Sequence, residues 1–284
     1  MKRTWTVLII ALALVAAACG GSDNTTTPAD DGNAVACGVD DLALKTPGTL
    51  TVATGEPVFP PWMEDDDPTN GEGFESAVVY AVATEMGISN VEWVRTEFDA
   101  AISAGEKDYD FNIQQYSITE ERDQIVDFSR PYYSAKQALV GFNAGVVAEG
   151  ATVADLKDLR FGAAIGTTSL SYIDDVIKPT TAAAVYNDTV DAKSALEAGQ
   201  IDVLVMDLPT AYYITAVEIE GSEIVGVLPG LTAAPEELGM LFEEGSKLVP
   251  CVNKALDSLD ADGTLAKLET QWLNQGGDIT VIQP

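Results

Sequence analysis

The sequence predicts an α/β protein in which buried strands alternate with amphipathic helices. The segment TLTVAT (residues 49–54) is a short run of β-branched and apolar residues, which is typical of a strand. Residues 74–86 carry apolar side chains at helical spacing and are followed by Gly87, a residue that favours helix ends. Repeated alternation of this kind is typical of sheets with largely parallel strands.

The remaining elements continue the alternation along the chain. Further strands are predicted at residues 91–96, 110–115, 138–143, 160–166, 183–188 and 201–207. Further helices are predicted at residues 169–177, 190–198, 209–217, 246–259 and 264–273. Ligands of open α/β sheets bind beyond the carboxyl ends of strands, so the candidate site lies in the segments that follow them. These segments are Phe59–Trp62, Gln114–Ser117, Gly166–Thr168 and Asp207.

The composition excludes several classes of function. The chain has 45 Asp+Glu, 15 Lys+Arg and no His, with a formal net charge of -30. Such a surface repels nucleic acid, whose phosphates need basic side chains. The absence of His removes Ser-His-Asp catalysis and His-ligated metal sites. Neither a cofactor nor a metal is expected.

The N-terminus indicates export and lipid anchoring. Residues 1–18 form a signal peptide, with Lys2 and Arg3 before an apolar core that is too short to span a bilayer comfortably. The segment ends at Cys19, the pattern of a bacterial lipoprotein signal in which the cysteine is acylated. Residues 19–37 are then a flexible tether, and the folded part is extracytoplasmic. The alternative is an ordinary signal peptide with a chance cysteine.

Two further cysteines, Cys37 and Cys251, remain in the exported part of the chain. Outside the cell such a pair favours a disulfide, because the reducing systems of the cytosol are absent there. The alternative is two free buried thiols.

Five segments resemble, in order, the bacterial extracellular solute-binding proteins of family 3. They are PGTLTVATGEPVFPPW, GEGFESAVVYAVATEMG, GEKDYDFNIQQYSITEERDQIVDFSRPYY, LKDLRFGAAIGTTSL and ALEAGQIDVLVMDLPTAYY. The likeness covers about residues 45–275. It implies a two-lobed fold of the periplasmic-binding-protein type II, with a ligand cleft between lobes joined by two hinge crossings. Lobe 1 would comprise residues 38–136 and 232–284, and lobe 2 residues 137–231, with crossings near residues 134–138 and 226–233.

The resemblance also implies a role for each candidate site residue. Arg122 would grip a ligand carboxylate, because a guanidinium presents a rigid fork of donors. Asp207 would accept from a ligand ammonium. The remaining candidates would complete the site: Ser117, Gln115, Thr168, Gly166 and Thr167 as polar partners, Phe59, Trp62 and Phe98 as an apolar wall, and Gln114 as an amide that departs from the family pattern.

Each assignment has a plainer alternative. Arg122 could pair with Glu120 or Asp123 at the surface, and Asp207 could cap the helix that begins near Pro209. Thr168 could likewise cap a helix, and the aromatic residues could serve lobe packing.

The resemblance implies a monomeric lipoprotein that captures an amino-acid-like solute and delivers it to the permease of an ABC importer. It does not imply an enzyme. Two alternatives stay open, namely a sensory lipoprotein and a dehydratase-like enzyme that uses Asp207 or Glu75 as an acid.

Overall fold

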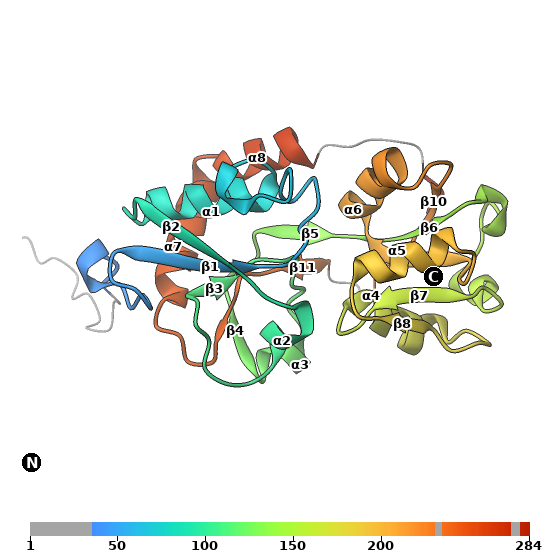
Figure 1. Ribbon diagram of the computed structural model, residues 1–284, viewed down its shortest axis with the longest axis horizontal. Helices are drawn as coiled ribbons and strands as arrows, with labels where there is room; N and C mark the ends of the chain where they lie inside the picture. The colour runs from blue at the N-terminus through green and yellow to red at the C-terminus, as the bar shows by residue number, and fades with distance from the viewer. Residues whose placement is uncertain (1–35, 231–234, 274–278) are drawn as a thin grey trace, which may run out of the picture. The chain divides into compact units, whose positions relative to one another are not determined.

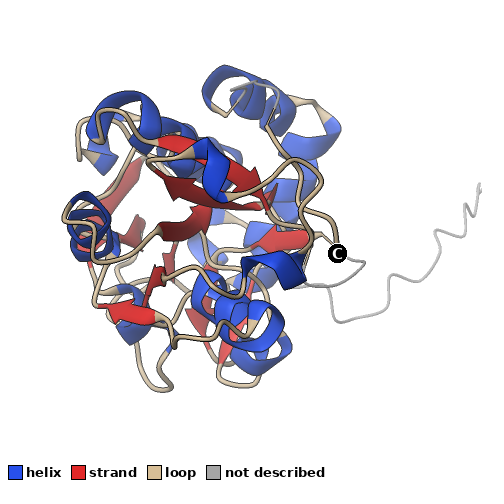
Figure 2. Cartoon of the chain, turned by 90° about the vertical axis from the view of Figure 1, so that its right-hand side faces the viewer, coloured by secondary structure: helices blue, strands red, loops and turns tan. Residues whose placement is uncertain are grey.

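The computed structural model describes residues 36–230, 235–273 and 279–284. The predicted signal peptide, Cys19 and nearly all of the tether lie outside these residues. The described chain contains two five-stranded sheets and one two-stranded sheet, with helices packed against them (Figures 1 and 2). We call the sheet of β1–β4 and β12, with its helices, lobe 1. We call the sheet of β6–β10, with its helices, lobe 2.

Lobe 1 has the strand order β2-β1-β3-β12-β4. Its strands are β1 (Thr49–Thr54), β2 (Asn90–Arg95), β3 (Phe111–Asn112), β4 (Val126–Phe128) and β12 (Leu241–Glu243). Its helices are α1 (Phe74–Glu85), α2 (Phe98–Ile102), α3 (Glu120–Asp123), α7 (Val249–Ala261) and α8 (Thr264–Trp272), with 3-10 turns η1 (Val39–Asp41) and η2 (Pro68–Asn70). Strand β1 pairs in parallel with β2 and β3, whereas β12 runs antiparallel to β3 and β4.

Lobe 2 has the strand order β10-β6-β9-β7-β8. Its strands are β6 (Gln137–Gly141), β7 (Phe161–Ala164), β8 (Ala184–Tyr186), β9 (Val203–Asp207) and β10 (Glu223–Val227). Its helices are α4 (Thr168–Tyr172), α5 (Thr189–Glu197) and α6 (Leu208–Tyr213), with 3-10 turns η3 (Ala144–Val146) and η4 (Val153–Leu156) and π-helical turns η5 (Ile173–Ile177) and η6 (Ile214–Glu218).

Both sheets are mixed, and this corrects the expectation of largely parallel sheets. In lobe 2 the parallel set is β8, β7 and β9, while β6 runs antiparallel to β9 and β10 runs antiparallel to β6. In each lobe a single strand runs against the other four: β12 in lobe 1 and β6 in lobe 2. Each of these two strands follows closely after a strand that lies between the lobes, so it enters its sheet from the hinge side and runs against the strands that are joined by helices.

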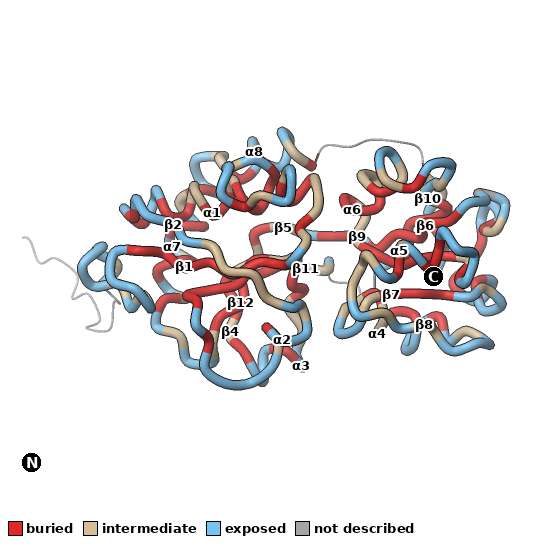
Figure 3. Tube along the Cα trace, in the orientation of Figure 1, coloured by how far each residue is buried: buried red, intermediate tan, exposed pale blue. Residues whose placement is uncertain are grey.

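Apolar residues of the strands form the cores of both lobes (Figure 3). All six residues of β1 are buried, as a strand covered on both faces requires. Helix α1 places Val78, Val79 and Val82 in the lobe 1 core, with α7 and α8 packed beside it.

Two antiparallel strands lie where the chain passes between lobes. Strand β5 (Tyr133–Ala135) pairs with β11 (Glu236–Leu238), so that Glu236 lies opposite Ala135. Lys136 alone separates β5 from β6 of lobe 2. These paired strands are the described parts of two connections between lobes.

The assignment of residues 232–284 to lobe 1 is wrong at the C-terminal end. Ile282 is fully buried in the core of lobe 2, and its backbone N–H donates to Val227 O over 2.9 Å. Gln283 forms a further backbone bond with Ala151 of lobe 2. The chain therefore returns to lobe 2 after α8. The final segment is too short to carry a periodic pattern, so the sequence alone does not reveal this return.

The disulfide prediction is confirmed. Cys37 and Cys251 are joined with an S–S distance of 2.05 Å and a Cα–Cα distance of 5.4 Å. The bond links the segment before β1 to α7. Within the described ranges, no helix combines the length and the apolar character needed to cross a membrane.

Candidate functional site: a pocket between two lobes

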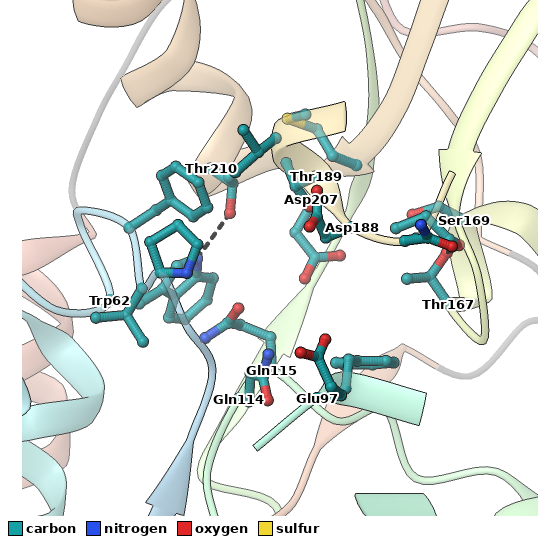
Figure 4. Close-up of a pocket in the computed structure, with 18 of the residues that line it drawn as sticks. Trp62, Glu97, Gln114, Gln115, Thr167, Ser169, Asp188, Thr189, Asp207 and Thr210 are labelled. Carbon is teal, nitrogen blue, oxygen red and sulfur yellow. Dashed lines mark hydrogen bonds between the residues drawn. The ribbon is translucent and has the colours of Figure 1, made fainter. Parts of the chain in front are cut away.

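A pocket is lined by loops at the carboxyl ends of strands from both lobes (Figure 4). Lobe 1 contributes Glu97, the loop after β1 and the segment after β3. Lobe 2 contributes α4, the start of α5 and the end of β9. Nine of the predicted site residues line it: Phe59, Trp62, Phe98, Gln114, Gln115, Ser117, Thr167, Thr168 and Asp207. Arg122 and Gly166 are not among the described lining residues.

Aromatic residues form part of the lobe 1 wall. Trp62 is 1% exposed, and its Nε1 donates to Thr210 Oγ1 of α6 over 2.7 Å. This hydrogen bond joins the two lobes across the pocket. Phe98 stacks on Tyr116 with ring centroids 4.5 Å apart, which fixes the ring at the pocket edge.

Gln115 has a left-handed backbone conformation with φ of 51°, which ends the strand predicted at residues 110–115. The observed strand β3 stops at Asn112. Glu75 holds Gln115 in place, because Glu75 Oε1 accepts from Gln115 N over 2.9 Å and Glu75 Oε2 accepts from Gln115 Nε2. Tyr132 Oη also donates to Glu75. Burial raises the pKa of Glu75 to about 7, although these three donors oppose the shift.

Gln114 packs its side chain against the backbone of Gly55. A Cβ atom at Gly55 would be 2.3 Å from Gln114 Nε2. Tyr116 Oη donates to Gln114 Oε1 over 3.1 Å. The close approach of Gly55 therefore allows a glutamine to stand at the pocket.

Arg122 is 7% exposed and forms neither of the two ion pairs considered for it. Its Nη1 donates to Ser117 O over 2.7 Å, and its Nη2 donates to Gly166 O of lobe 2 over 2.9 Å. The guanidinium carbon lies 5.7 Å from the centroid of the Phe98 ring. Among the residues that the structure describes, no carboxylate lies within ion-pair distance of Arg122. The surface pairing with Glu120 or Asp123 is therefore wrong, and Arg122 bridges the lobes through two carbonyls.

Glu236 of β11 connects both lobes at the same place. Its Oε1 accepts from Ser117 Oγ of lobe 1 over 2.7 Å and from Thr168 Oγ1 of lobe 2 over 2.5 Å. The two hydroxyl oxygens are 3.2 Å from each other. A carboxylate from the hinge thus binds the two hydroxyls that the sequence assigns to a ligand.

Asp207 and Glu236 share one amide donor. Gln137 Nε2 lies 2.6 Å from Asp207 Oδ1 and 3.1 Å from Glu236 Oε2. Gln137 is 4% exposed, and its Oε1 accepts from Ser169 Oγ over 2.5 Å. Burial, with further contributions from Glu236 and Glu75, raises the pKa of Asp207 to about 8. Asp207 is partly exposed and lines the pocket, so a ligand cation can reach it.

Neither Asp207 nor Thr168 caps a helix with its side chain. Asp207 stands at the N-cap position of α6 but makes no side-chain capping bond. Thr167, not Thr168, caps α4 by accepting from Leu170 N over 3.2 Å. The side chains of Asp207 and Thr168 therefore serve the pocket region rather than a helix end.

Several polar residues of this region have no counterpart in the sequence prediction. Glu97, Asp188 and Thr210 line the pocket, and Gln137 and Glu236 support it from behind. Glu97 directly precedes the predicted residue Phe98, and Thr210 follows the predicted residue Asp207 by three positions. Glu236 has no motif around it. Groups of three or more carboxylate or cysteine side chains suited to a metal ion are absent from the described part of the chain.

Comparison with known proteins identifies solute-binding proteins as the relatives of this chain. The model of the bacterial extracellular solute-binding proteins, family 3, matches residues 50–275. The L-cystine-binding protein TcyJ of Escherichia coli strain K12 is 28% identical over 241 residues, which are 84% of this chain and 86% of that protein. The L-arginine-binding protein of Pseudomonas aeruginosa is 29% identical over 253 residues, which are 82% of this chain and 94% of that protein.

Solved structures of the same kind superpose on the fold. An ancestral arginine-binding protein bound to glutamine has a TM-score of 0.67 and 30% identity, with 81% of this chain and 100% of that chain covered. An ancestral amino acid-binding protein described as a precursor of cyclohexadienyl dehydratase has a TM-score of 0.65 and 27% identity, with 80% and 96% covered. With its two lobes, paired connecting strands and shared pocket, the chain belongs to the bacterial extracellular solute-binding proteins of family 3.

Proposed function

We propose that this solute-binding protein captures a small amino-acid-like solute in the pocket between its lobes and delivers it to the permease of an ABC importer. The observation that carries the proposal is the pocket itself, which is lined by Asp207 of lobe 2 and by Gln115 and Ser117 of lobe 1. The relatives named above bind cystine or arginine, which supports an amino acid or a related amine as the class of ligand.

In this proposal the ligand ammonium donates to Asp207. A carboxylate is a strong acceptor for an ammonium, and charge-assisted hydrogen bonds of this kind contribute about 1.5–3 kcal/mol each. Asp207 Oδ1 accepts from Gln137 Nε2, and this bond keeps the carboxylate oriented. The other oxygen, Oδ2, has no hydrogen bond to the described side chains.

Arg122 is proposed to contribute to the carboxylate end of the ligand. Its bonds to Ser117 O and Gly166 O use two of the five N–H donors of the guanidinium, so three remain for a ligand carboxylate. Closure of the hinge would complete the site around that carboxylate.

Binding can be tested by a thermal-shift panel of amino acids, amines and compatible solutes. A ligand at 100 times its dissociation constant adds about 2.7 kcal/mol to the free energy of unfolding. We expect at least one amino acid or related amine to raise the melting temperature in proportion to its concentration. If no member of the panel does so, the proposed ligand class is wrong.

Delivery to a permease needs a separate test, since a sensory protein would bind the same ligand. We expect deletion of the chain to abolish uptake of the labelled ligand by cells and re-expression to restore it. Normal uptake with an altered transcriptional response would favour the sensory alternative.

One observation favours an enzymatic alternative. Asp207 lines the pocket with a raised pKa, as a general acid requires, and one structural relative is described as a precursor of a dehydratase. Glu75 is a weaker candidate because its carboxyl is fully buried and is bonded to Gln115 and Tyr132. Chromatographic analysis after prolonged incubation with the bound ligand decides this, and we expect the ligand to be recovered unchanged.

A further inference from the structure

The hydroxyls of Ser117 and Thr168 already form hydrogen bonds within the protein. A hydroxyl has one O–H to donate and two lone pairs with which to accept. Both hydroxyls lie within hydrogen-bond distance of Glu236 Oε1, at 2.7 Å and 2.5 Å, and within 3.2 Å of each other. With the carboxylate of Glu236 as the acceptor, each proton points either to Glu236 or to the other hydroxyl. The pocket side of Ser117 and Thr168 therefore presents lone pairs.

Arg122 is bonded to the backbone at the same place. Its Nη1 and Nη2 donate to the carbonyls of Ser117 and Gly166. Burial lowers the pKa of Arg122, and the charges of neighbours that include Glu236 oppose that shift. Arg122 and Glu236 are thus linked through Ser117, whose carbonyl accepts from Arg122 and whose hydroxyl donates to Glu236.

The described side chains that line the pocket carry no positive charge that could attract a ligand carboxylate. Among the described lining residues the ionisable side chains of Asp, Glu, Lys and Arg are those of Glu56, Glu97, Asp188 and Asp207, all acidic. Asp188 accepts from Asp191 N as the cap of α5, so its carboxylate is partly engaged. Asp207 and Glu97 come from opposite lobes (Figure 4).

We propose that Glu236 is a positioning residue that sets the charge specificity of this site. Its carboxylate competes with a ligand carboxylate for the hydroxyls of Ser117 and Thr168, so the site selects a ligand by its cationic N–H groups. The ligand class is therefore a small solute of net positive charge, such as a basic amino acid or the amine derived from it. This inference rests on the proposed function, because it concerns the ligand of the same pocket.

The test uses three probes that differ in one group each. L-arginine carries a carboxylate and a cationic side chain, agmatine is the same molecule without the carboxylate, and L-citrulline is nearly isosteric with arginine but has a neutral side chain. We expect the wild-type protein to bind agmatine within about tenfold of arginine, and citrulline about a hundredfold more weakly. Isothermal titration gives the three dissociation constants.

In the variant Glu236→Ala, the ligand carboxylate should contribute more to affinity than the cationic side chain does. Removal of the carboxylate frees the hydroxyls of Ser117 and Thr168 to donate to a ligand carboxylate. The ratio of arginine to agmatine affinity should then rise by about tenfold or more, while the ratio of arginine to citrulline affinity falls. The control is Glu237→Ala, because Glu237 is the exposed neighbour on the same strand and its removal changes the net charge equally. Glu237→Ala should leave both ratios unchanged.

Glu236→Gln covers the case in which Glu236→Ala does not fold. The amide keeps the side-chain length and one acceptor oxygen but removes the charge, so the preference for arginine over citrulline should weaken with little change in melting temperature. Three outcomes overturn the inference: wild-type affinity for citrulline equal to that for arginine, unchanged ratios in the Glu236 variants, or binding of other amino acids but of none of these probes. Absence of binding across the whole thermal-shift panel instead contradicts the proposed function.

Discussion

Trp62 and Thr210 join the two lobes through one hydrogen bond. Trp62 Nε1 lies 2.7 Å from Thr210 Oγ1, and the indole is 1% exposed (Figure 4). Trp62 belongs to the loop after β1 of lobe 1, and Thr210 belongs to α6 of lobe 2. The bond can exist only while the lobes are close, so it contributes to the balance between open and closed forms.

Thr210→Val should therefore weaken ligand binding through closure. Valine keeps the shape of threonine but removes the acceptor, which leaves a buried indole N–H at a cost of about 1–3 kcal/mol in the closed form. We expect the dissociation constant to rise by about tenfold or more, and tryptophan fluorescence to show a more solvent-exposed indole.

The control for this change is Thr270→Val. Thr270 lies on the exposed face of α8, and its hydroxyl donates only to Ala266 O of its own helix. Its removal should leave the dissociation constant unchanged. Equal affinity of Thr210→Val and the wild-type protein would mean that the bond between lobes does not influence binding.

The elements that were well predicted are those with a strong local pattern. The observed β1 has the predicted bounds, and α1 ends one residue before the predicted helix does, because buried strands and amphipathic helices leave periodic apolar residues. The strand predicted at residues 110–115 is shorter, since the left-handed conformation of Gln115 depends on hydrogen bonds that Gln115 donates to Glu75, which is 40 residues away.

Only the site residues that belong to recognisable sequence motifs could be predicted. Nine of the predicted residues line the pocket, because they follow strands whose ends meet at the cleft. Glu236 and Gln137 were missed, since their importance depends on the packing of the connecting strands against both lobes. The return of Ile282 to lobe 2 was missed for the same reason.

Arg122→Ala should reduce both stability and ligand binding. The change removes the donors to Ser117 O and Gly166 O, and the carbonyl of the buried Ser117 left without a partner costs about 1–3 kcal/mol. Arg122→Lys should also be destabilising, because an ammonium cannot reproduce a planar fork that reaches two carbonyls. Urea denaturation measures the free energy of unfolding, and titration measures affinity.

Arg130→Ala is the matched comparison for Arg122. Arg130 pairs with Asp257 and Asp260 on the surface, where an ion pair contributes at most about 1 kcal/mol. If Arg122→Ala costs no more than Arg130→Ala and leaves affinity unchanged, the role assigned to Arg122 is wrong.

Loss of the disulfide should destabilise the protein without changing its ligand preference. The bond between Cys37 and Cys251 closes a loop with a sequence separation of 214 residues. The chain-entropy model gives about 5 kcal/mol for a loop of this size, as an upper bound. We expect the double variant Cys37→Ser, Cys251→Ser to melt at a lower temperature and to keep the same ligand ranking, as measured by calorimetry. A melting temperature that is insensitive to both substitution and reductant would contradict this expectation.

Cys19→Ser should release the protein from membranes. Cys19 lies outside the described residues, and the prediction rests on the signal-like segment before it. If the cysteine is acylated, its removal should move the protein to the soluble fraction without a change in ligand affinity. Continued membrane association of the variant would contradict lipid anchoring at this position.

Asp207 should release a proton when a cationic ligand binds near neutral pH. Burial and the nearby charge of Glu236 raise its pKa to about 8, so the carboxyl is largely protonated at pH 7 in the unliganded protein. A ligand ammonium favours the ionised form and lowers that pKa. Titrations in two buffers of different ionisation enthalpy measure the proton release. Asp207→Asn should abolish the release and weaken binding by about tenfold or more, since a neutral amide replaces the carboxylate.

The same pKa shift determines how stability depends on pH in the unliganded protein. The folded state holds a proton on Asp207 that the unfolded state loses above the ordinary pKa of 3.8. The contribution to stability is therefore full below about pH 4 and is lost as pH rises towards 8, with a slope of at most about 1.4 kcal/mol per pH unit. Asp207→Asn should flatten this decline. Asp202→Asn is the control, because Arg160 lowers the pKa of Asp202 and its contribution is lost only in acid. A decline between pH 5 and pH 8 that is equally steep in Asp207→Asn and in the wild-type protein would show that Asp207 does not hold this proton.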